Sequence, residues 1–233
     1  MSEKDKMLAG ELYDANYDEE LIKDRCKAKD ICFEYNNLKP SDFEGKDRII
    51  KKLFAKTGKQ IIVEQNFWCD YGYNIFVGEN FYMNHNCTIL DGAKVEFGDN
   101  VFIAPNCGFY TAGHPLDYET RNKGLEYAKT IKVGSNVWIG GNVCVMPGVT
   151  IGDNVVIGAG SVVTKDIPSN VVAVGNPCRV LKEIWKIIIL GKIEKINERR
   201  KRYESDYLYR GTDRNKNESI DVDSIIKYTK IWR

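Results

Sequence analysis

Large apolar residues recur at every sixth position over much of the chain, and the residue that follows is most often Gly or Ala. A period of six fits neither an α-helix, which repeats about every 3.6 residues, nor the simple alternation of a strand. The regular series consists of Phe97, Ile103 and Phe109, followed by Val133, Ile139, Val145, Ile151, Ile157 and Val163. An earlier series, at Val77, Met83 and Ile89, keeps the spacing but is out of phase by two residues.

This period predicts a solenoid of short parallel strands, in which three hexads make one coil and the apolar side chains stack inside. The segments between hexads support this interpretation. Gly and Asn tolerate the positive φ angles of tight corners, and Pro-Gly at 147–148 is typical of a type II turn. The motif Gly-x-Asn recurs at 78–80, 98–100, 134–136 and 152–154.

The hexads stop after Phe109 and return only at Val133. The intervening residues, about 111–132, are mostly polar, so we expect them to leave the stack as an outward loop. A loop of this length in a compact domain is usually functional or disordered. One of the two histidines, His114, lies at its start. Gly113 allows the chain to turn there, and Pro115 restricts His114 to extended backbone.

Residues 1–60 show the three-to-four spacing of amphipathic helices, which we expect to pack on the solenoid. One helix is predicted to start after Asp18, its cap, and a second to end near Gly58. The stripe of the first helix consists of Leu21, Arg25, Ala28, Cys32 and Tyr35. The second places Ile49, Ile50, Leu53 and Phe54 on one side.

Composition narrows the class of protein. With 43% hydrophobic and 29% charged residues the chain is typical of a globular protein, and no apolar run has the length of a membrane span. The charged N-terminus lacks the apolar region of a secretory signal, so a cytoplasmic location is expected. Seven cysteines without a Cys-x-x-Cys pair favour reduced thiols. A net charge of +1 argues against a nucleic-acid-binding protein.

The charge is unevenly distributed. From Ile184 onward there are 13 Lys and Arg against 8 Asp and Glu, which gives about +5, whereas the rest of the chain carries about −4. Residues 183–233 are therefore interpreted as a basic C-terminal extension, either a solvated helical segment or one that binds an anionic partner or membrane surface.

Several long segments resemble the maltose and galactoside O-acetyltransferases, a branch of the hexapeptide-repeat acyltransferases. They include "MLAGELYDA", "DYGYNIFVGENFYMNHNCTILD", "TAGHP" and "NVWIGGNVCVMPGVTIGDNVVIGAGSVVTKDIPSNVVAVGNPCRV". The resemblance implies a mainly β protein, with a left-handed parallel β-helix at 61–182, an N-terminal helical region and a C-terminal helical extension. It also implies a homotrimer with active sites between subunits. The extension after Lys182 departs from the family pattern.

The implied activity is transfer of acetyl from acetyl-CoA to a hydroxyl of a simple sugar, by direct attack in a ternary complex without a metal. By this resemblance His114 is the general base, a role that suits imidazole because its pKa lies near neutrality. The amide of Asn84 would stabilise the oxyanion of the tetrahedral intermediate. His85 follows Asn84 on a predicted strand and should face the other way, as a packing or surface residue.

The resemblance also implies contacts with both substrates. Carboxylates can accept pairs of sugar hydroxyls, and the matching acceptor positions are Asp70, Tyr82, Asp91 and, less directly, Asp14. Asp70 replaces a serine of the galactoside branch, which favours a maltose-like or glucose-like acceptor. For Asp91 and Asp14 a solvated turn is the alternative.

Coenzyme A would be bound through backbone amides and basic side chains. Ordinary surface charge is the alternative for the basic residues. The positions that match the family are Trp138, Gly141, Ala159, Thr164, Lys165, Arg179 and Lys182.

Other functions remain open at this point. The acceptor could be a hydroxylated antibiotic, or the chain could be a non-catalytic solenoid scaffold. A covalent mechanism through Cys87 or Cys107 lacks an evident histidine partner. Carbonic anhydrases on the same solenoid need three histidine ligands for each zinc ion, which two histidines cannot supply within one subunit.

Overall fold

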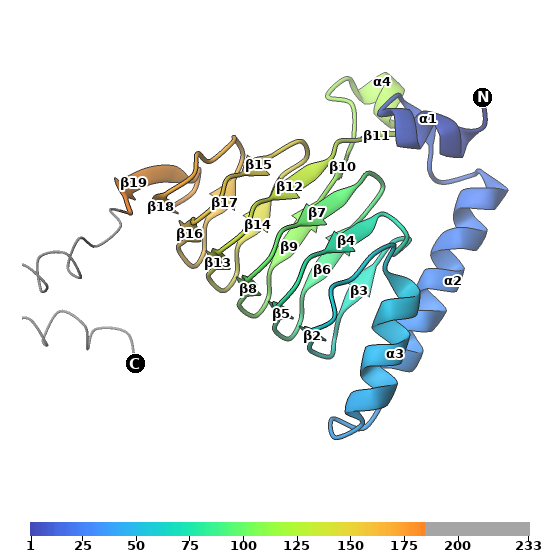
Figure 1. The fold of residues 1–233 in the computed structure, drawn as a ribbon. Helices are drawn as coiled ribbons and strands as arrows, with labels where there is room; N and C mark the ends of the chain where they lie inside the picture. Colours follow the sequence, from blue (N-terminus) through green and yellow to red (C-terminus); the bar gives the residue numbers. More distant parts are fainter. Residues whose placement is uncertain (185–233) are drawn as a thin grey trace, which may run out of the picture. The chain divides into compact units, whose positions relative to one another are not determined.

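The computed structural model describes residues 1–184 of the 233-residue chain. Within them, helices at the start of the chain lead into a stack of short parallel strands, as Figure 1 shows. The predicted C-terminal extension, 183–233, lies outside the described residues except for its first two.

Three parallel sheets form the walls of the solenoid. The first wall contains β2 (Ile61–Val63), β5 (Phe81–Met83), β8 (Val101–Ile103), β13 (Val137–Ile139), β16 (Val156–Ile157), β18 (Val171–Val174) and the antiparallel β19 (Arg179–Glu183). The second contains β3 (Trp68–Cys69), β6 (Thr88–Leu90), β9 (Gly108–Tyr110), β14 (Cys144–Val145) and β17 (Val162–Val163). The third contains β4 (Ile75–Val77), β7 (Val95–Phe97), β12 (Ile131–Val133) and β15 (Thr150–Ile151).

The chain visits the three walls in turn, so each coil consists of three strands and three corners. Every apolar residue of both hexad series is buried, and together they form the interior of the stack. The prediction of a three-sided parallel β-helix preceded by helices is therefore confirmed.

The corners follow the predicted backbone geometry. Asn80, Asn100, Asn136 and Asn154 have φ angles of 53°, 56°, 59° and 54°. Their side chains also connect neighbouring coils, because the amide of Asn80 donates to Oδ1 of Asn100 over 2.8 Å. Gly148, in the predicted Pro-Gly turn, has a φ of 83°.

The phase shift between the two hexad series has a simple geometric cause. Val133 pairs with Ile151, eighteen positions later, whereas Val77 pairs with Phe97, twenty positions later. The corner between β6 and β7 holds the two additional residues, and it contains Asp91. The longer corner does not disturb the stack, as the burial of both Val77 and Phe97 shows.

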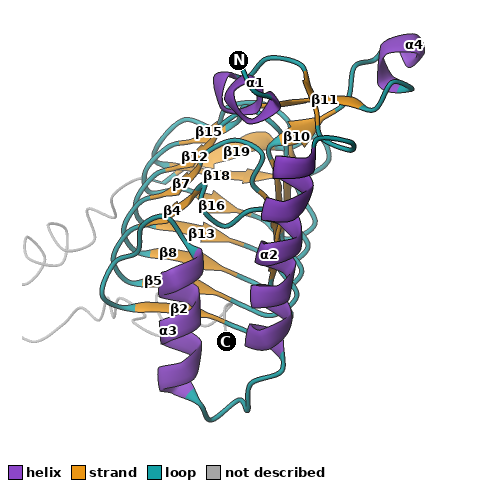
Figure 2. Ribbon diagram, turned by 90° about the vertical axis from the view of Figure 1, so that its right-hand side faces the viewer, coloured by secondary structure: helices purple, strands orange, loops and turns teal. Residues whose placement is uncertain are grey.

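Helices α2 (Glu19–Asn36) and α3 (Phe43–Leu53) cover the first coil, as Figure 2 shows. The carboxylate of Asp18 accepts a hydrogen bond from the amide of Leu21 over 2.9 Å, which confirms the predicted cap. A shorter helix, α1 (Glu3–Ala9), precedes them; it lies within the region 1–60 that was predicted to be helical, although neither of the two predicted helices included it.

The prediction that the second helix extends to Gly58 is wrong. Helix α3 ends at Leu53, and the amides of Ala55 and Gly58 already donate to carbonyls of the third wall. A Cβ atom at Gly58 would lie 2.4 Å from the carbonyl oxygen of Gly78. Gly58 is therefore required by close packing between coils and not by a helix end.

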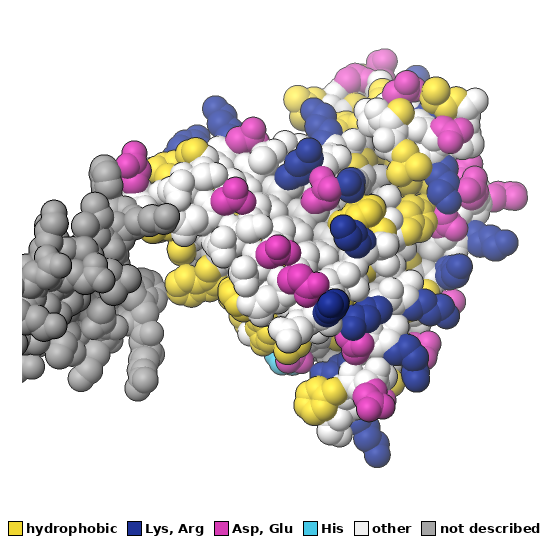
Figure 3. Space-filling view, in the orientation of Figure 1, with side chains coloured by type: hydrophobic (Ala, Val, Ile, Leu, Met, Phe, Trp, Pro, Cys, Tyr) yellow, Lys and Arg dark blue, Asp and Glu magenta, His cyan; other side chains and the backbone are white. Residues whose placement is uncertain are grey.

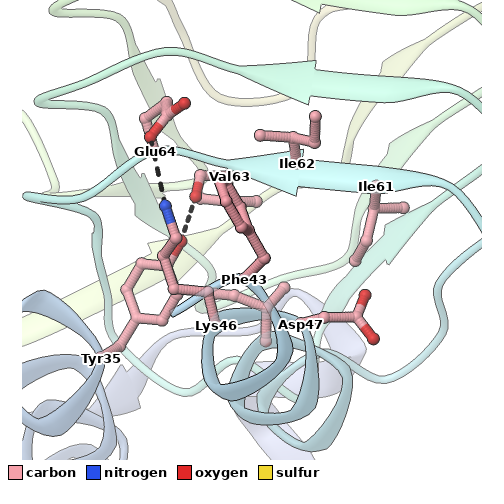
Figure 4. A pocket seen from close by; sticks show the side chains of 9 residues that line it. Tyr35, Phe43, Lys46, Asp47, Ile61, Ile62, Val63 and Glu64 are labelled. Carbon is pink, nitrogen blue, oxygen red and sulfur yellow. Dashed lines mark hydrogen bonds and ion pairs between the residues drawn. The ribbon is translucent and has the colours of Figure 1, made fainter. Parts of the chain in front are cut away.

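A hollow of about 350 Å³ lies between α3 and β2, shown in Figure 4. The phenol of Tyr35 donates to the carbonyl of Val63, and the ammonium of Lys46 lies 3.7 Å from Oε2 of Glu64. None of the predicted site residues lines this hollow. It belongs to the helical cap, by which we mean α2 and α3 over the first coil.

The excursion between β9 and β12 is present and folded. It contains β10 (Ala112–Gly113), α4 (Tyr118–Arg121) and β11 (Leu125–Ala128). Strand β11 pairs antiparallel with β10 on one side and with β1 (Tyr13–Asp14) on the other. The predicted outward loop is thus a small sheet completed by the N-terminal segment, which projects from the solenoid in Figure 1.

The surface agrees with the near-neutral composition. On the face seen in Figure 3, basic and acidic side chains are interspersed. All seven cysteines, which lie within residues 1–184, carry free thiols. No helix in this part of the chain is long and apolar enough to cross a membrane.

The stacked interior should dominate stability. Ile139→Ala, at a fully buried position of β13, should lower the free energy of unfolding by about 2–5 kcal/mol because it leaves a cavity between coils. Ile22→Ala, at a position of α2 that is 37% exposed, makes the same chemical change and should alter it by less than about 0.5 kcal/mol. Urea denaturation at matched protein concentrations measures both. Equal losses would contradict the assignment of stability to the stack.

Candidate functional site

The predicted site residues gather along two different edges of the solenoid. Edge A consists of the corners after β5, β8, β13 and β16, where the chain passes from the first wall to the second. Edge B consists of the corners after β3, β6, β9, β14 and β17, where it passes from the second wall to the third. The first wall and edge A carry Tyr82, Asn84, Trp138, Gly141 and Ala159. Edge B carries Asp70, Asp91, Thr164, Lys165 and, on the excursion, His114.

His114 follows β10 at the start of the excursion, and its side chain is half exposed. Its Nδ1 atom lies 3.3 Å from the carbonyl oxygen of Leu125. A carbonyl oxygen can only accept, so the neutral ring that makes this bond carries its hydrogen on Nδ1 and leaves Nε2 free to take a proton. In this tautomer the free lone pair of the ring is on Nε2.

Glu126, on β11, is a functional candidate that the sequence analysis missed. Its Oε1 atom lies 3.8 Å from Nε2 of His114, and its other oxygen accepts a hydrogen bond of 3.2 Å from the phenol of Tyr13. A carboxylate at this distance attracts the imidazolium that forms when His114 takes a proton. The alternation in "LEYA" could have signalled a strand inside the excursion, with Glu126 on one of its faces.

Asp91 lies at the long corner between β6 and β7 and has no exposed surface. Its carboxylate accepts hydrogen bonds from the amides of Asp70 (3.0 Å), Tyr71 (2.8 Å) and Asn74 (3.4 Å). Burial raises the pKa of Asp91 to about 7, although the amides of Tyr71 and Asn74 act in the opposite direction. In this structure Asp91 shapes the 70–74 corner, and its contact with an acceptor stays a prediction.

Asp70 is presented by that corner and is half-buried. Burial raises the pKa of its carboxyl, against the lowering effect of the positive charges of Lys29 and Arg25. Arg25 was predicted to lie on the apolar stripe of its helix, but it points to this region. Its guanidinium donates to the phenol of Tyr71 over 2.8 Å and to the carbonyl of Ala15. It therefore links α2, the N-terminal segment and the corner that carries Asp70.

Asp14 also reaches this region, because β1 pairs it with Leu125 of β11. Its carboxylate is engaged locally and accepts hydrogen bonds from the amides of Asn16 and Tyr17 over 3.0 and 2.9 Å. Tyr82 lies on the first wall and is not brought to Asp70 within one chain.

Asn84 lies on edge A directly after β5, which ends at Met83. The prediction that Asn84 and His85 share a strand is therefore wrong, since both lie in the corner. The Oδ1 atom of Asn84 accepts a hydrogen bond of 2.8 Å from the amide of His85. This contact fixes the side chain through its oxygen and leaves its amide nitrogen as the available donor.

Edge A also exposes backbone donors at the positions predicted for coenzyme A. In the two corners that contain Gly141 and Ala159, the residue before and the residue after donate their amides to neighbouring coils. Within residues 1–184 the amides of Gly141 and Ala159 themselves have no hydrogen-bond partner. A ligand along edge A could accept from both.

The remaining predicted contacts are exposed. Trp138 is 46% exposed on the first wall, in register with Phe102. Thr164 and Lys165 follow β17 on edge B, and Arg179 and Lys182 lie on β19. In the part of the chain described here, no group of three or more His, Cys, Asp or Glu side chains could hold a metal ion.

The two predicted catalytic side chains do not meet in a single chain. Asn84 follows a strand of the first wall, whereas His114 follows the second wall on the excursion. The whole of the second wall therefore separates their edges. Within one chain the imidazole of His114 therefore lies on edge B, and the side chain of Asn84 and the amides of Gly141 and Ala159 lie on edge A.

The raised pKa of Asp91 gives a pH-dependent prediction. Because its folded value, about 7, lies above its ordinary value of 3.8, the group favours folding below the ordinary pKa, and this stabilisation is lost as the pH rises through about 7. Asp91→Asn cannot ionise and keeps an acceptor for the amides of Asp70 and Tyr71. We therefore expect the free energy of unfolding of the variant minus that of the wild type, both measured in urea, to increase from about pH 5 to about pH 8. If the free energies of unfolding of the variant and the wild type changed with pH in parallel, the burial of an ionisable group at Asp91 would be contradicted.

Comparison with known proteins agrees with the fold. Residues 6–58 match the family model described as the maltose acetyltransferase hexapeptide capping motif. Residues 130–165 match that of the bacterial transferase hexapeptide with six repeats.

Individual relatives extend the similarity over most of the chain. The galactoside O-acetyltransferase of Escherichia coli is 48% identical over 77% of this chain and 88% of its own length. The crystal structure of a maltose O-acetyltransferase from Clostridium difficile is 58% identical, covers 80% of this chain and 99% of its own, and superimposes with a TM-score of 0.78. A galactoside acetyltransferase in complex with coenzyme A is 47% identical, covers 81% of this chain and 94% of its own, and has a TM-score of 0.78. The chain therefore belongs to the maltose and galactoside O-acetyltransferase family of hexapeptide-repeat enzymes.

Proposed function

We propose that the protein transfers acetyl from acetyl-CoA to a hydroxyl of a maltose-like or glucose-like sugar, with His114 as general base. The observation that carries the proposal is the imidazole with Nδ1 at the carbonyl of Leu125 and Nε2 facing the carboxylate of Glu126. This geometry favours proton uptake at one defined nitrogen.

The proposed reaction uses these groups in turn. The acceptor oxygen attacks the thioester carbonyl carbon while its proton passes to Nε2 of His114. The side-chain amide of Asn84 stabilises the oxyanion of the resulting tetrahedral intermediate. When the intermediate collapses, the bond between carbon and sulfur breaks, and the departing thiolate takes the proton from the imidazolium. Attraction from Glu126 stabilises the charged ring between the two proton transfers.

Asp70 is the proposed anchor for the sugar. A carboxylate can accept two neighbouring hydroxyls, and its position beside Arg25 and the excursion brings it to the same region as His114. Tyr82 and Asp14 are further proposed contacts. Asp91 is buried, so we propose that it serves the acceptor site by shaping the corner that carries Asp70.

Coenzyme A is the proposed occupant of edge A. The amides of Gly141 and Ala159, which have no partner within residues 1–184, suit the polar groups of its pantetheine arm, and the exposed ring of Trp138 suits its apolar parts. Basic and hydroxyl side chains would bind its phosphates. The proposed phosphate contacts are Arg179 and Lys182, on β19, and Thr164 and Lys165, which lie on edge B.

We further propose that a complete site forms between two copies of the chain, edge B of one facing edge A of the next. Because Asn84 and His114 lie on separate edges, a second copy is the simplest way to join them. In a cyclic homotrimer every edge has such a neighbour. Three equivalent sites would result.

The general base is tested directly by His114→Ala. We expect its kcat to fall by about 10²- to 10⁴-fold, in a thiol-release assay with acetyl-CoA across mono- and disaccharides and hydroxylated antibiotics. His85→Ala is the matched control and should retain the wild-type rate. Full activity of His114→Ala at saturating acceptor would refute the proposed base, and turnover of antibiotics alone would refute the sugar acceptor.

The shared site is tested by complementation. His114→Ala and Asn84→Ala, each nearly inactive alone, are unfolded together in equal amounts and refolded. Sites that combine the intact edge of each variant should restore about a quarter of the wild-type activity. The double variant His114→Ala/Asn84→Ala, refolded with wild type, provides the control. Failure to recover activity in mixed oligomers of confirmed composition would contradict a site shared between copies.

A further inference from the structure

The two contacts of the His114 ring come from consecutive residues of β11. Leu125 supplies the carbonyl at Nδ1, and Glu126 supplies the carboxylate at Nε2. Both residues are paired with β1, since Tyr13 lies opposite Glu126 and Asp14 lies opposite Leu125. The N-terminal segment therefore holds the strand that holds the imidazole.

Tyr13 adds a side-chain contact to this pairing. Its phenol donates to Oε2 of Glu126 over 3.2 Å, while Oε1 of the same carboxylate faces His114. The terminal torsion of a glutamate side chain has broad energy minima, so a carboxylate held at only one end can rotate easily. With one oxygen held by the phenol, the other is directed toward the ring.

The phenol has little freedom to move. Tyr13 is 2% exposed and packs in a small apolar cluster with Tyr71, Ala93 and Ala128. A Cβ atom at Gly92 would lie 3.1 Å from the phenol oxygen, so the corner of the solenoid confines it closely. Burial raises the pKa of Tyr13 well above its ordinary value, which keeps the hydroxyl protonated as a donor.

We propose that Tyr13 is a positioning residue for acetyl transfer, because it holds the carboxylate of Glu126 toward Nε2 of His114. The inference rests on the proposed role of His114 as the base. It makes the segment before the solenoid a working part of the site and not only a cap. Tyr13 acts through Glu126 and touches neither substrate.

The variant Tyr13→Phe tests this role, because it removes one oxygen and keeps the ring that fills the cluster. Loss of a hydrogen bond to a charged group should lower kcat by about 10-fold, while KM for acetyl-CoA stays unchanged. Tyr35→Phe is the matched control. Tyr35 is also fully buried, and its phenol donates to the carbonyl of Val63 in the cap, so its loss should leave kcat unchanged.

A double-mutant cycle separates positioning from general structure. In a Glu126→Ala background the phenol has no carboxylate to hold, so adding Tyr13→Phe should have no further effect on kcat. If Tyr13→Phe lowers kcat equally in both backgrounds, or if it retains the wild-type kcat in the native background, the inference is overturned.

The His114→Ala variant distinguishes the two proposals. If it keeps full activity, the proposed base is wrong, whatever Tyr13 does. If it is inactive while Tyr13→Phe behaves as wild type, only the inference about Tyr13 fails. Thermal unfolding of Tyr13→Phe and Tyr35→Phe, run in parallel, shows whether any loss of rate follows a loss of stability.

Discussion

No coil of the solenoid has a core of its own, because each buries its apolar residues against the coils on either side. The fold therefore depends on keeping one large apolar residue in register at every sixth position, as the complete burial of residues such as Ile139 and Phe109 shows. Any segment that cannot supply this pattern must leave the stack. The excursion after β9 does so, and the extra residues around Asp91 are taken up in a corner. Both departures occur on edge B, beside the proposed acceptor site.

The groups of the proposed site are positioned in two ways, by the regular stack on edge A and by the segments that depart from it on edge B. The stack fixes the amides of Gly141 and Ala159 along edge A at equivalent corners of successive coils. The groups of edge B are positioned differently, by hydrogen bonds among the corner at 70–74, helix α2, the excursion and β1. Arg25 and Tyr13 are among the side chains that connect these parts.

The repeat made the solenoid predictable, because its period is local and its corner residues have strong backbone preferences. The end of α3 was misjudged because Gly58 resembles a helix stop, whereas its lack of a side chain serves contact with Gly78 of the next coil. His114 could be selected from its place at a break in the repeat. The alternation in "LEYA" could have indicated the strand that carries Glu126, but not the contacts of its carboxylate, because these include Tyr13, which is 113 residues away in the chain. The burial of Asp91 likewise depends on amides contributed by a different coil.

The stacking of coils also fixes distances along the solenoid axis. In the second wall, β9, β14 and β17 are successive neighbours, and adjacent strands are spaced about 4.8 Å apart. Strand β9, which precedes the excursion with His114, and β17, which precedes Thr164, are thus separated by about 10 Å along the axis. Inserting or deleting a whole coil between them would change this separation by one strand spacing while leaving each corner intact. The number of coils between them therefore sets the distance between the proposed base, His114, and the proposed phosphate contact at Thr164.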